Sequence, residues 1–231
     1  MANTDVISTT TLSGFADYDG LALSDVSTPG FITHTASSTA STLDEIWLWV
    51  CNVSTADEKF SLEVSVSGAG AVDAVFENTV PSESGLFLAC PGWTLGNGAV
   101  LRTLAVGAAS FTGFGYVNRI TTATKRVVLS GSTDGRPINV TTTATPGQTI
   151  HTSSSSVDSV SLWCGNTGSV TRELNVEWGE TGAGALIQMD VAANSTVQVT
   201  DGLRLGASNT ITAYESSGAD LAIIGHVNRL S

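Results

Sequence analysis

The chain has 231 residues, of which only 13% are charged, and its formal net charge is −12. Serine, threonine, glycine, alanine and valine are its commonest residues, a composition typical of turn-rich β proteins rather than of disordered chains. A surface this acidic repels phosphate backbones, so we expect no binding to nucleic acid.

Short strands separated by turns are expected along the first half. Residues 6–12 are rich in β-branched side chains and end at Ser13-Gly14, which indicates a strand followed by a turn. In residues 59–67 apolar and polar side chains alternate, so we expect one face of that strand on the core and the other in water. Further strands are expected at 31–35, 46–50, 72–80, 86–90, 99–106 and 111–120, with glycine-rich turns at 68–71 and 182–185.

The second half of the chain repeats the first. Gly115-Tyr116-Val117-Asn118-Arg119-Ile120 returns as Gly225-His226-Val227-Asn228-Arg229-Leu230, and Leu12-Ser13-Gly14 returns as Leu129-Ser130-Gly131. The offset falls from 117 at Leu12 to 110 at Arg119, as small loop deletions would make it. We therefore expect two tandem domains from an internal duplication, residues 1–121 and 122–231, each of ordinary domain size.

Each domain is expected to be all-β. We count about eight strands per domain, with turn signals about every 8–12 residues and no persuasive helical period, which indicates a small antiparallel β-sandwich. The jelly-roll and immunoglobulin-like types both fit this pattern. The Cys…Trp…Cys spacing of true immunoglobulin domains is absent, and the strand order is left open.

One expected strand is apolar on both faces. Ile46-Trp47-Leu48-Trp49-Val50 has no polar residue, whereas the second copy has Ser161 in the place of Trp47. A central strand covered on both sides would explain the pattern. The alternative is an interface with another subunit, because aromatic side chains are enriched in interface cores. The candidate interface residues are Trp47, Trp49, Trp93 and Trp163.

Two opposite charges are kept in both copies. Asp44 matches Asp158 and Arg119 matches Arg229 in sequences that otherwise differ, so we hypothesise that each arginine bonds the aspartate of its own domain. Exposed pairs of this kind contribute only about 0–1 kcal/mol, and separate solvation is the alternative.

Two histidines also match, His34 and His151, and each has only serine and threonine as polar neighbours in the sequence. No carboxylate lies within four positions of either histidine. We therefore expect no metal or proton-transfer site at these positions.

No catalytic pattern is present. The chain lacks a Gly-x-Ser-x-Gly elbow, a His-Glu-x-x-His motif and a phosphate-binding loop with its lysine, so we expect neither an enzyme nor a bound cofactor. Cys51, Cys90 and Cys164 form no Cys-x-x-Cys pair and are odd in number, which favours free thiols over zinc or disulfides. Neither a signal peptide nor a membrane helix is indicated, so we expect a protein made in a cytoplasm, with no membrane partner.

The later part of both copies resembles one protein family. Residues 81–92 with the closing segment 115–120, and residues 192–203 with the closing segment 225–230, resemble small all-β virion proteins of tailed bacteriophages. Those proteins have one such module and close on a similar Gly-Phe-Val-Asn-Arg segment. The resemblance implies a non-enzymatic structural component of a virion, assembled in the cytoplasm of a host bacterium.

Within that class a head decoration or cement protein is favoured, bound to the major capsid protein and present as a homo-oligomer. Two linked modules raise avidity on a lattice that presents repeated sites. A neck or tail adaptor, or a protein that anchors fibres, is the alternative. A lectin-like module that binds a surface glycan through exposed aromatic side chains and carboxylates is a further alternative. An enzyme acting on glycans would need paired carboxylates, which no spacing in the chain supplies.

Overall fold

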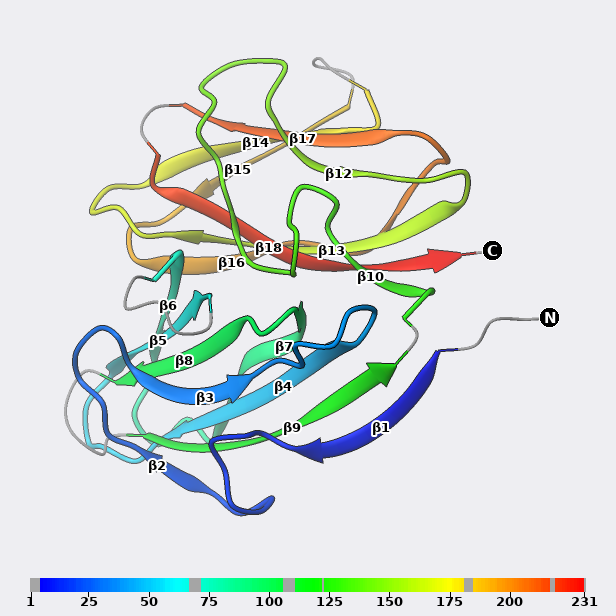
Figure 1. Ribbon diagram of the computed structural model, residues 1–231. Coiled ribbons are helices and arrows are strands. Elements are labelled where there is room, and N and C mark those ends of the chain that lie inside the picture. The colour runs from blue at the N-terminus through cyan, green and yellow to red at the C-terminus, as the bar shows by residue number, and fades with distance from the viewer. Residues whose placement is uncertain are drawn as a thin grey trace. The chain divides into compact units, whose positions relative to one another are not determined.

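The computed structural model describes residues 5–66, 72–105, 111–121, 123–180, 185–216 and 219–230. The chain divides into two compact units, Asp5–Ala123 and Thr124–Ser231. The regular elements within these ranges are β-strands, nine in each unit (Figure 1), so the all-β class is confirmed. No helix long and apolar enough to cross a membrane occurs in them. The glycine-rich turns expected at 68–71 and 182–184 lie outside the described residues.

The first unit has two antiparallel sheets (Figure 1). The five-stranded sheet has the order β1-β9-β4-β7, with β2 also paired to β9, and the four-stranded sheet has the order β3-β8-β5-β6. The strands are β1 (Val6–Thr11), β2 (Leu21–Leu23), β3 (Phe31–Thr35), β4 (Leu43–Asn52), β5 (Glu58–Ser65), β6 (Ala74–Val80), β7 (Leu86–Gly96), β8 (Val100–Ala105) and β9 (Phe111–Thr121).

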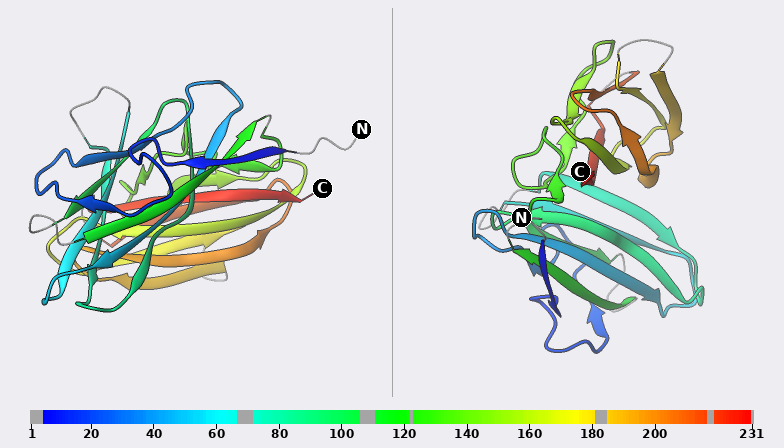
Figure 2. Two further views of the ribbon diagram at one scale, coloured as in Figure 1. Left: turned by 90° about the horizontal axis from the view of Figure 1, so that it is seen from below. Right: turned by 90° about the vertical axis from the view of Figure 1, so that its right-hand side faces the viewer.

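The second unit repeats this arrangement strand for strand, and its strands run from green through yellow to red in Figure 2. Its sheets have the orders β10-β18-β13-β16, with β11 also paired to β18, and β12-β17-β14-β15. The strands are β10 (Arg126–Val128), β11 (Ile138–Asn139), β12 (Gln148–Thr152), β13 (Val157–Asn166), β14 (Arg172–Trp178), β15 (Leu186–Val191), β16 (Ser195–Leu205), β17 (Thr210–Glu215) and β18 (Leu221–Leu230).

Both units follow one pairing rule. In the first unit β1 and β2 lie along the last strand, β9. Moving inward along the chain from both ends, β3 pairs with β8, β4 with β7, and β5 with β6. These pairs alternate between the two sheets. The chain of each unit is therefore one long antiparallel hairpin that has been wound into two sheets, which supplies the strand order that sequence reasoning left open.

Buried side chains connect the two sheets within each unit. In the first unit Phe60 of β5 packs on Phe111 of β9 with ring centroids 5.2 Å apart, and Phe76 of β6 packs on Trp93 of β7 at 4.8 Å. Each of these pairs joins one sheet to the other. In the second unit a single buried cluster draws on β13 and β18 of one sheet and on β14 and β17 of the other.

The polar side of strand β5 is buried at Ser61, Glu63 and Ser65, so the expectation that it faces water was wrong for these residues, whereas Lys59 is exposed. Glu63 is completely buried because its carboxylate accepts hydrogen bonds from the hydroxyl of Thr28 at 2.6 Å and from the backbone N–H of Gly30 at 2.8 Å. Glu177 of β14 holds the matching loop at residues 145–147 in the same way. Alternation in the sequence reports polarity, but it does not reveal that a loop packs over the polar side.

Candidate functional site

A histidine, an aspartate and an arginine from three strands meet inside the first unit. The buried carboxylate of Asp44 accepts hydrogen bonds from Nε and Nη2 of Arg119, both at 2.8 Å, and lies 3.0 Å from Nε2 of His34. The backbone N–H of Ser37 also donates to it, at 2.9 Å. The register of β4 and β9 places Asp44 directly opposite Arg119, so pairing of the strands brings the two charges together.

The second unit contains the same cluster. His151 Nε2 lies 2.9 Å from the carboxylate of Asp158, and Arg229 Nε lies 3.3 Å from it. The hypothesis that each arginine bonds the aspartate of its own domain is therefore confirmed in both units. Sequence analysis did not link the histidines to these aspartates, because the aspartate follows ten residues after His34 and seven after His151.

Each histidine is held in one tautomer. The backbone N–H of Ser13 donates to Nδ1 of His34 at 3.2 Å, and that of Ser130 donates to Nδ1 of His151 at 3.1 Å. A ring nitrogen that accepts a hydrogen bond carries no hydrogen, so the proton lies on Nε2 and is donated to the aspartate.

The charges in the clusters follow from burial and hydrogen bonding. Burial alone would raise the pKa of Asp44, but hydrogen bonds from Arg119 and His34 outweigh it and hold that pKa well below its usual range. Burial lowers the pKa of His151, against the opposing hydrogen bond with Asp158. In the first unit the environment therefore favours the ionised form of Asp44, and in the second unit it favours the neutral form of His151.

These clusters are built to connect strands. Both ring nitrogens of each histidine are engaged within the chain, which leaves neither one to accept a proton from a substrate or to bind a metal. The described residues contain no group of three or more His, Cys, Asp or Glu side chains that could hold a metal ion. We therefore assign the clusters a structural role.

An aromatic surface lies on the outer face of the five-stranded sheet of the first unit. We give this name to Trp47 and Trp49 of β4, Phe114 and Tyr116 of β9, and Leu86 and Leu88 of β7. Cross-strand pairing places Trp47 opposite Tyr116, and Trp49 between Phe114 and Leu88. The intervening residues of β4 point into the core, where Ile46, Leu48 and Val50 are fully buried. The sequence therefore presents large apolar side chains on both faces of this strand.

The rings of the aromatic surface pack on one another. The centroids of Trp47 and Trp49 lie 6.0 Å apart, and that of Trp49 lies 5.9 Å from Tyr116. All four aromatic side chains are half-buried, while Leu86 and Leu88 are 61% and 37% exposed. Exposed apolar side chains that gather in this way mark binding surfaces more often than isolated ones do.

Two neighbours fix the position of Trp47. Its indole N–H donates a hydrogen bond of 2.6 Å to the carboxylate of Glu45, which is itself buried. Gly92 lies under the indole at a φ of +72°, where a Cβ atom would come within 3.0 Å of the ring. A glycine is needed there because it adopts this positive φ readily and has no side chain that would collide with the indole ring.

The other two predicted interface tryptophans do not belong to this surface. Trp93 is 1% exposed and packs against Phe76 in the core, so its assignment to an interface was wrong. Its place in β7 is opposite the inward-facing Ile46. Trp163 is 8% exposed and packs beside His226, with ring centroids 5.7 Å apart.

The matching face of the second unit is less apolar. Ser161 occupies the place of Trp47, and the strand register puts Thr196 and Gln198 in the places of Leu86 and Leu88. Only the first unit presents a cluster of half-buried aromatic rings among the residues that the structure describes.

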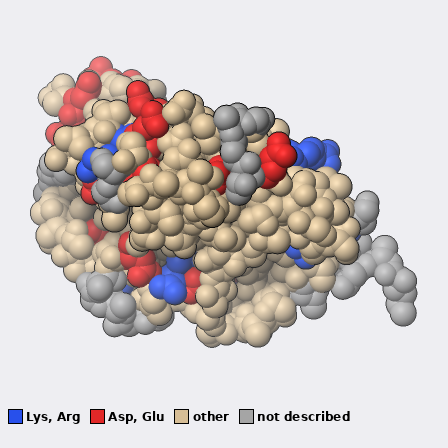
Figure 3. Space-filling view, turned by 90° about the horizontal axis from the view of Figure 1, so that it is seen from above, with Lys and Arg blue, Asp and Glu red and all other residues tan. Residues whose placement is uncertain are grey.

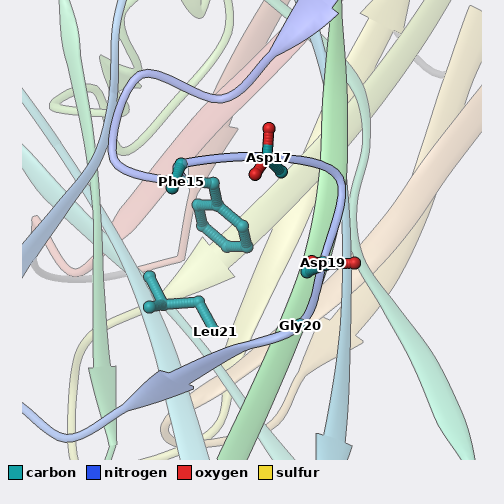
Figure 4. A pocket seen from close by; sticks show the side chains of 6 residues that line it. Phe15, Asp17, Asp19, Gly20 and Leu21 are labelled. Carbon is teal, nitrogen blue, oxygen red and sulfur yellow. The ribbon is translucent and has the colours of Figure 1, made fainter.

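A small pocket borders the aromatic surface. It has a volume of about 100 Å³ and combines apolar side chains with two exposed carboxylates (Figure 4). It is lined by Phe15, Ala16, Asp17, Asp19, Gly20 and Leu21. Gly20 touches the surface directly, since a Cβ atom on it would lie 2.6 Å from the ring of Phe114.

Charge is sparse on the face of the molecule in Figure 3, where Asp and Glu side chains form small separate groups among uncharged residues.

Sequence reasoning found Trp47 and Trp49 but missed Phe114, Tyr116 and the two leucines. The spacing Phe114-Gly115-Tyr116 was the available signal, because aromatic residues two positions apart on a strand share a face.

No protein-family model matches the chain. No curated protein matches it either. Among solved structures, it is similar to the N-terminal CBM22-1–CBM22-2 tandem domain of Xyn10C from Paenibacillus barcinonensis, with 11% sequence identity and a TM-score of 0.26 over 99% of this chain and 92% of that one.

Proposed function

We propose that this chain is a non-enzymatic structural protein of a bacteriophage virion, which attaches to other virion proteins through the aromatic surface of its first unit. The observation that carries the proposal is the cluster of Trp47, Trp49, Phe114 and Tyr116, flanked by exposed leucines on one sheet face. Interfaces are enriched in aromatic side chains at their centre. The favoured role is head decoration, with the major capsid protein as partner. A neck or tail adaptor is the alternative within the virion.

We also propose that each unit is a β-sandwich of the jelly-roll type. The strand order of a wound hairpin supports this assignment, as do the aromatic pairs that join the sheets of the first unit. Jelly rolls occur both in viral capsid proteins and in lectins. The fold is therefore compatible both with attachment to a capsid and with glycan binding. The side chains of the exposed surface, and not the fold, determine which of the two the protein does.

The proposal is tested with particles that lack the chain. Virions from a gene deletion are mixed with the purified full-length protein, sedimented, and analysed for bound protein. We expect saturable binding that the double variant Trp47→Ser, Leu88→Gln weakens at least about tenfold. Leu203→Gln is the matched control, because Leu203 is also an exposed leucine, at 43%, but lies on β16 of the second unit. Absence of binding by the unaltered protein would contradict a virion role.

Glycan binding is a second candidate, because sugars stack on clustered aromatic rings such as Trp47, Trp49 and Tyr116. Titration of the protein with neutral oligosaccharides, followed by tryptophan fluorescence, tests it. A saturable change that Trp49→Ala removes would replace the attachment proposal with a lectin-like function.

A further inference from the structure

The first unit presents almost only negative charge to a partner. Residues 1–121 contain twelve acidic and three basic side chains, a net charge of −9. All three basic side chains are engaged: Lys59 lies 3.5 Å from Glu77, Arg119 binds Asp44, and Arg102 is buried and bonded to Ser65. No basic side chain of the first unit is therefore left to neutralise its exposed acidic side chains. They include Asp17, Asp19, Asp25, Asp57 and Glu83.

Exposed acids lie next to the aromatic surface at two of its edges. Asp17 and Asp19 belong to the loop that ends at Gly20, which touches the ring of Phe114. Glu83 lies in the turn that leads into β7, three residues before Leu86. Exposed acidic residues therefore belong to the two segments that adjoin the apolar centre, the loop before β2 and the turn before β7.

From this juxtaposition we propose that the partner of the aromatic surface is a protein patch with an apolar centre and lysine or arginine side chains around it. The inference rests on the proposed attachment role and adds the chemistry of the partner and the unit that binds it. Complementary charge at the rim steers association and excludes partners of like charge. A second copy of this chain does not fit, because two first units would bring a charge of −9 against −9.

The second unit has different residues at three of the positions that carry the proposed contact. Ser161, Gln198 and Asn194 stand where the first unit has Trp47, Leu88 and Glu83. Asn194 and Glu83 share the same backbone conformation, with φ of 50° and 53°. The same strand arrangement accommodates these residues in the second unit, where Ser159 also stands in the place of the Glu45 that Trp47 bonds. The exchanges therefore provide variants that remove the binding groups, and the folding of each variant is measured.

The test uses the full-length protein and three fluorescently labelled peptides. The peptides share one apolar core with a tryptophan and leucines, and are flanked by lysine, glutamine or glutamate. Fluorescence anisotropy in a low-salt buffer measures each Kd. We expect the lysine-flanked peptide to bind about tenfold more tightly than the glutamine-flanked one, since exposed charge pairs contribute up to about 1 kcal/mol each. The glutamate-flanked peptide should bind most weakly, and high salt should remove the difference.

Variants locate the binding. Trp47→Ser with Leu88→Gln should weaken the lysine-flanked peptide about tenfold or more, whereas Leu203→Gln should leave its affinity unchanged. Glu83→Asn combined with Asp17→Asn should reduce the preference for lysine over glutamine. Asp190→Asn is the control for charge, because Asp190 is an exposed acid on β15 of the second unit. Circular dichroism confirms that each variant is folded.

Equal affinities for the lysine-flanked and glutamate-flanked peptides would overturn the inference. Binding that survives the change of Trp47 and Leu88 would do so as well, and so would self-association that the same change abolishes in sedimentation. The proposed attachment to virions can be refuted independently of this inference about the partner. If the chain binds the lysine-flanked peptide but never binds particles, the docking surface stands and the virion role is removed. If it binds particles independently of Trp47 and Leu88, the attachment role stands and this surface is not its contact.

Discussion

Replacing Asp44 with asparagine tests whether the buried cluster holds the first unit together. Asp44→Asn keeps the size of the side chain and removes its charge. The carboxylate now accepts two hydrogen bonds from Arg119, one from His34 and one from the N–H of Ser37. The amide would turn a donor toward groups that are themselves donors, so part of this network is lost.

The expected loss follows from burial. Breaking a fully buried ion pair costs about 3–5 kcal/mol. The side chain of Arg119 is 37% exposed, so water compensates part of its charge, and we expect the free energy of unfolding of the first unit to fall by about 2–3 kcal/mol. For a domain of this size that corresponds to a decrease in Tm of about 10 °C.

Calorimetry of the full chain at neutral pH measures the effect, with Asp158→Asn as the matched change in the second unit. Each variant should lower the transition of its own unit. Because the native pKa of Asp44 is depressed, its contribution is present above the unfolded value of 3.8 and is lost as the pH falls below it. The difference between wild type and Asp44→Asn should therefore shrink in acid. A loss below about 1 kcal/mol at neutral pH would refute the assigned role.

Three further changes follow from the structure. The native pKa of His151 lies below its unfolded value of 6.5, so the second unit should lose stability as the pH falls below about 6.5, and His151→Gln should flatten that dependence of Tm on pH. Burial raises the pKa of Glu215 above 4.5, so its ionised form destabilises the second unit as the pH rises; Glu215→Gln should raise Tm more at pH 8 than at pH 5, and an equal change at both would contradict this. In Gly115→Ala the new Cβ would lie 2.4 Å from the carbonyl oxygen of Trp47, which should cost about 2–3 kcal/mol in urea unfolding.

The duplication made most of the fold accessible to sequence reasoning. Comparison of the two copies gave the unit boundary to within two residues of the observed one at Ala123 and identified the Asp–Arg pairs without any structure. Opposite charges that are kept in two diverged copies are expected to interact. Here the strand register of β4 and β9 places Asp44 directly opposite Arg119.

Contacts between distant segments were not accessible in this way. His34 was dismissed because its neighbours in the sequence are small and polar, yet β3 and β4 bring it to Asp44. Asn52 and Asn166 were overlooked, although each donates hydrogen bonds to two backbone carbonyls and so holds the turn after its strand. Trp93 was misplaced because composition does not reveal which face of β7 a residue occupies.

The central claim is that the aromatic surface of the first unit is the attachment site, and a particle reconstruction that resolves side chains tests it most directly. We predict that this chain lies on the outer surface of the head with Trp47 and Trp49 buried against a neighbouring protein, and with basic side chains of that neighbour near Glu83. A reconstruction in which the chain is present but these two tryptophans face solvent in every copy would contradict the claim.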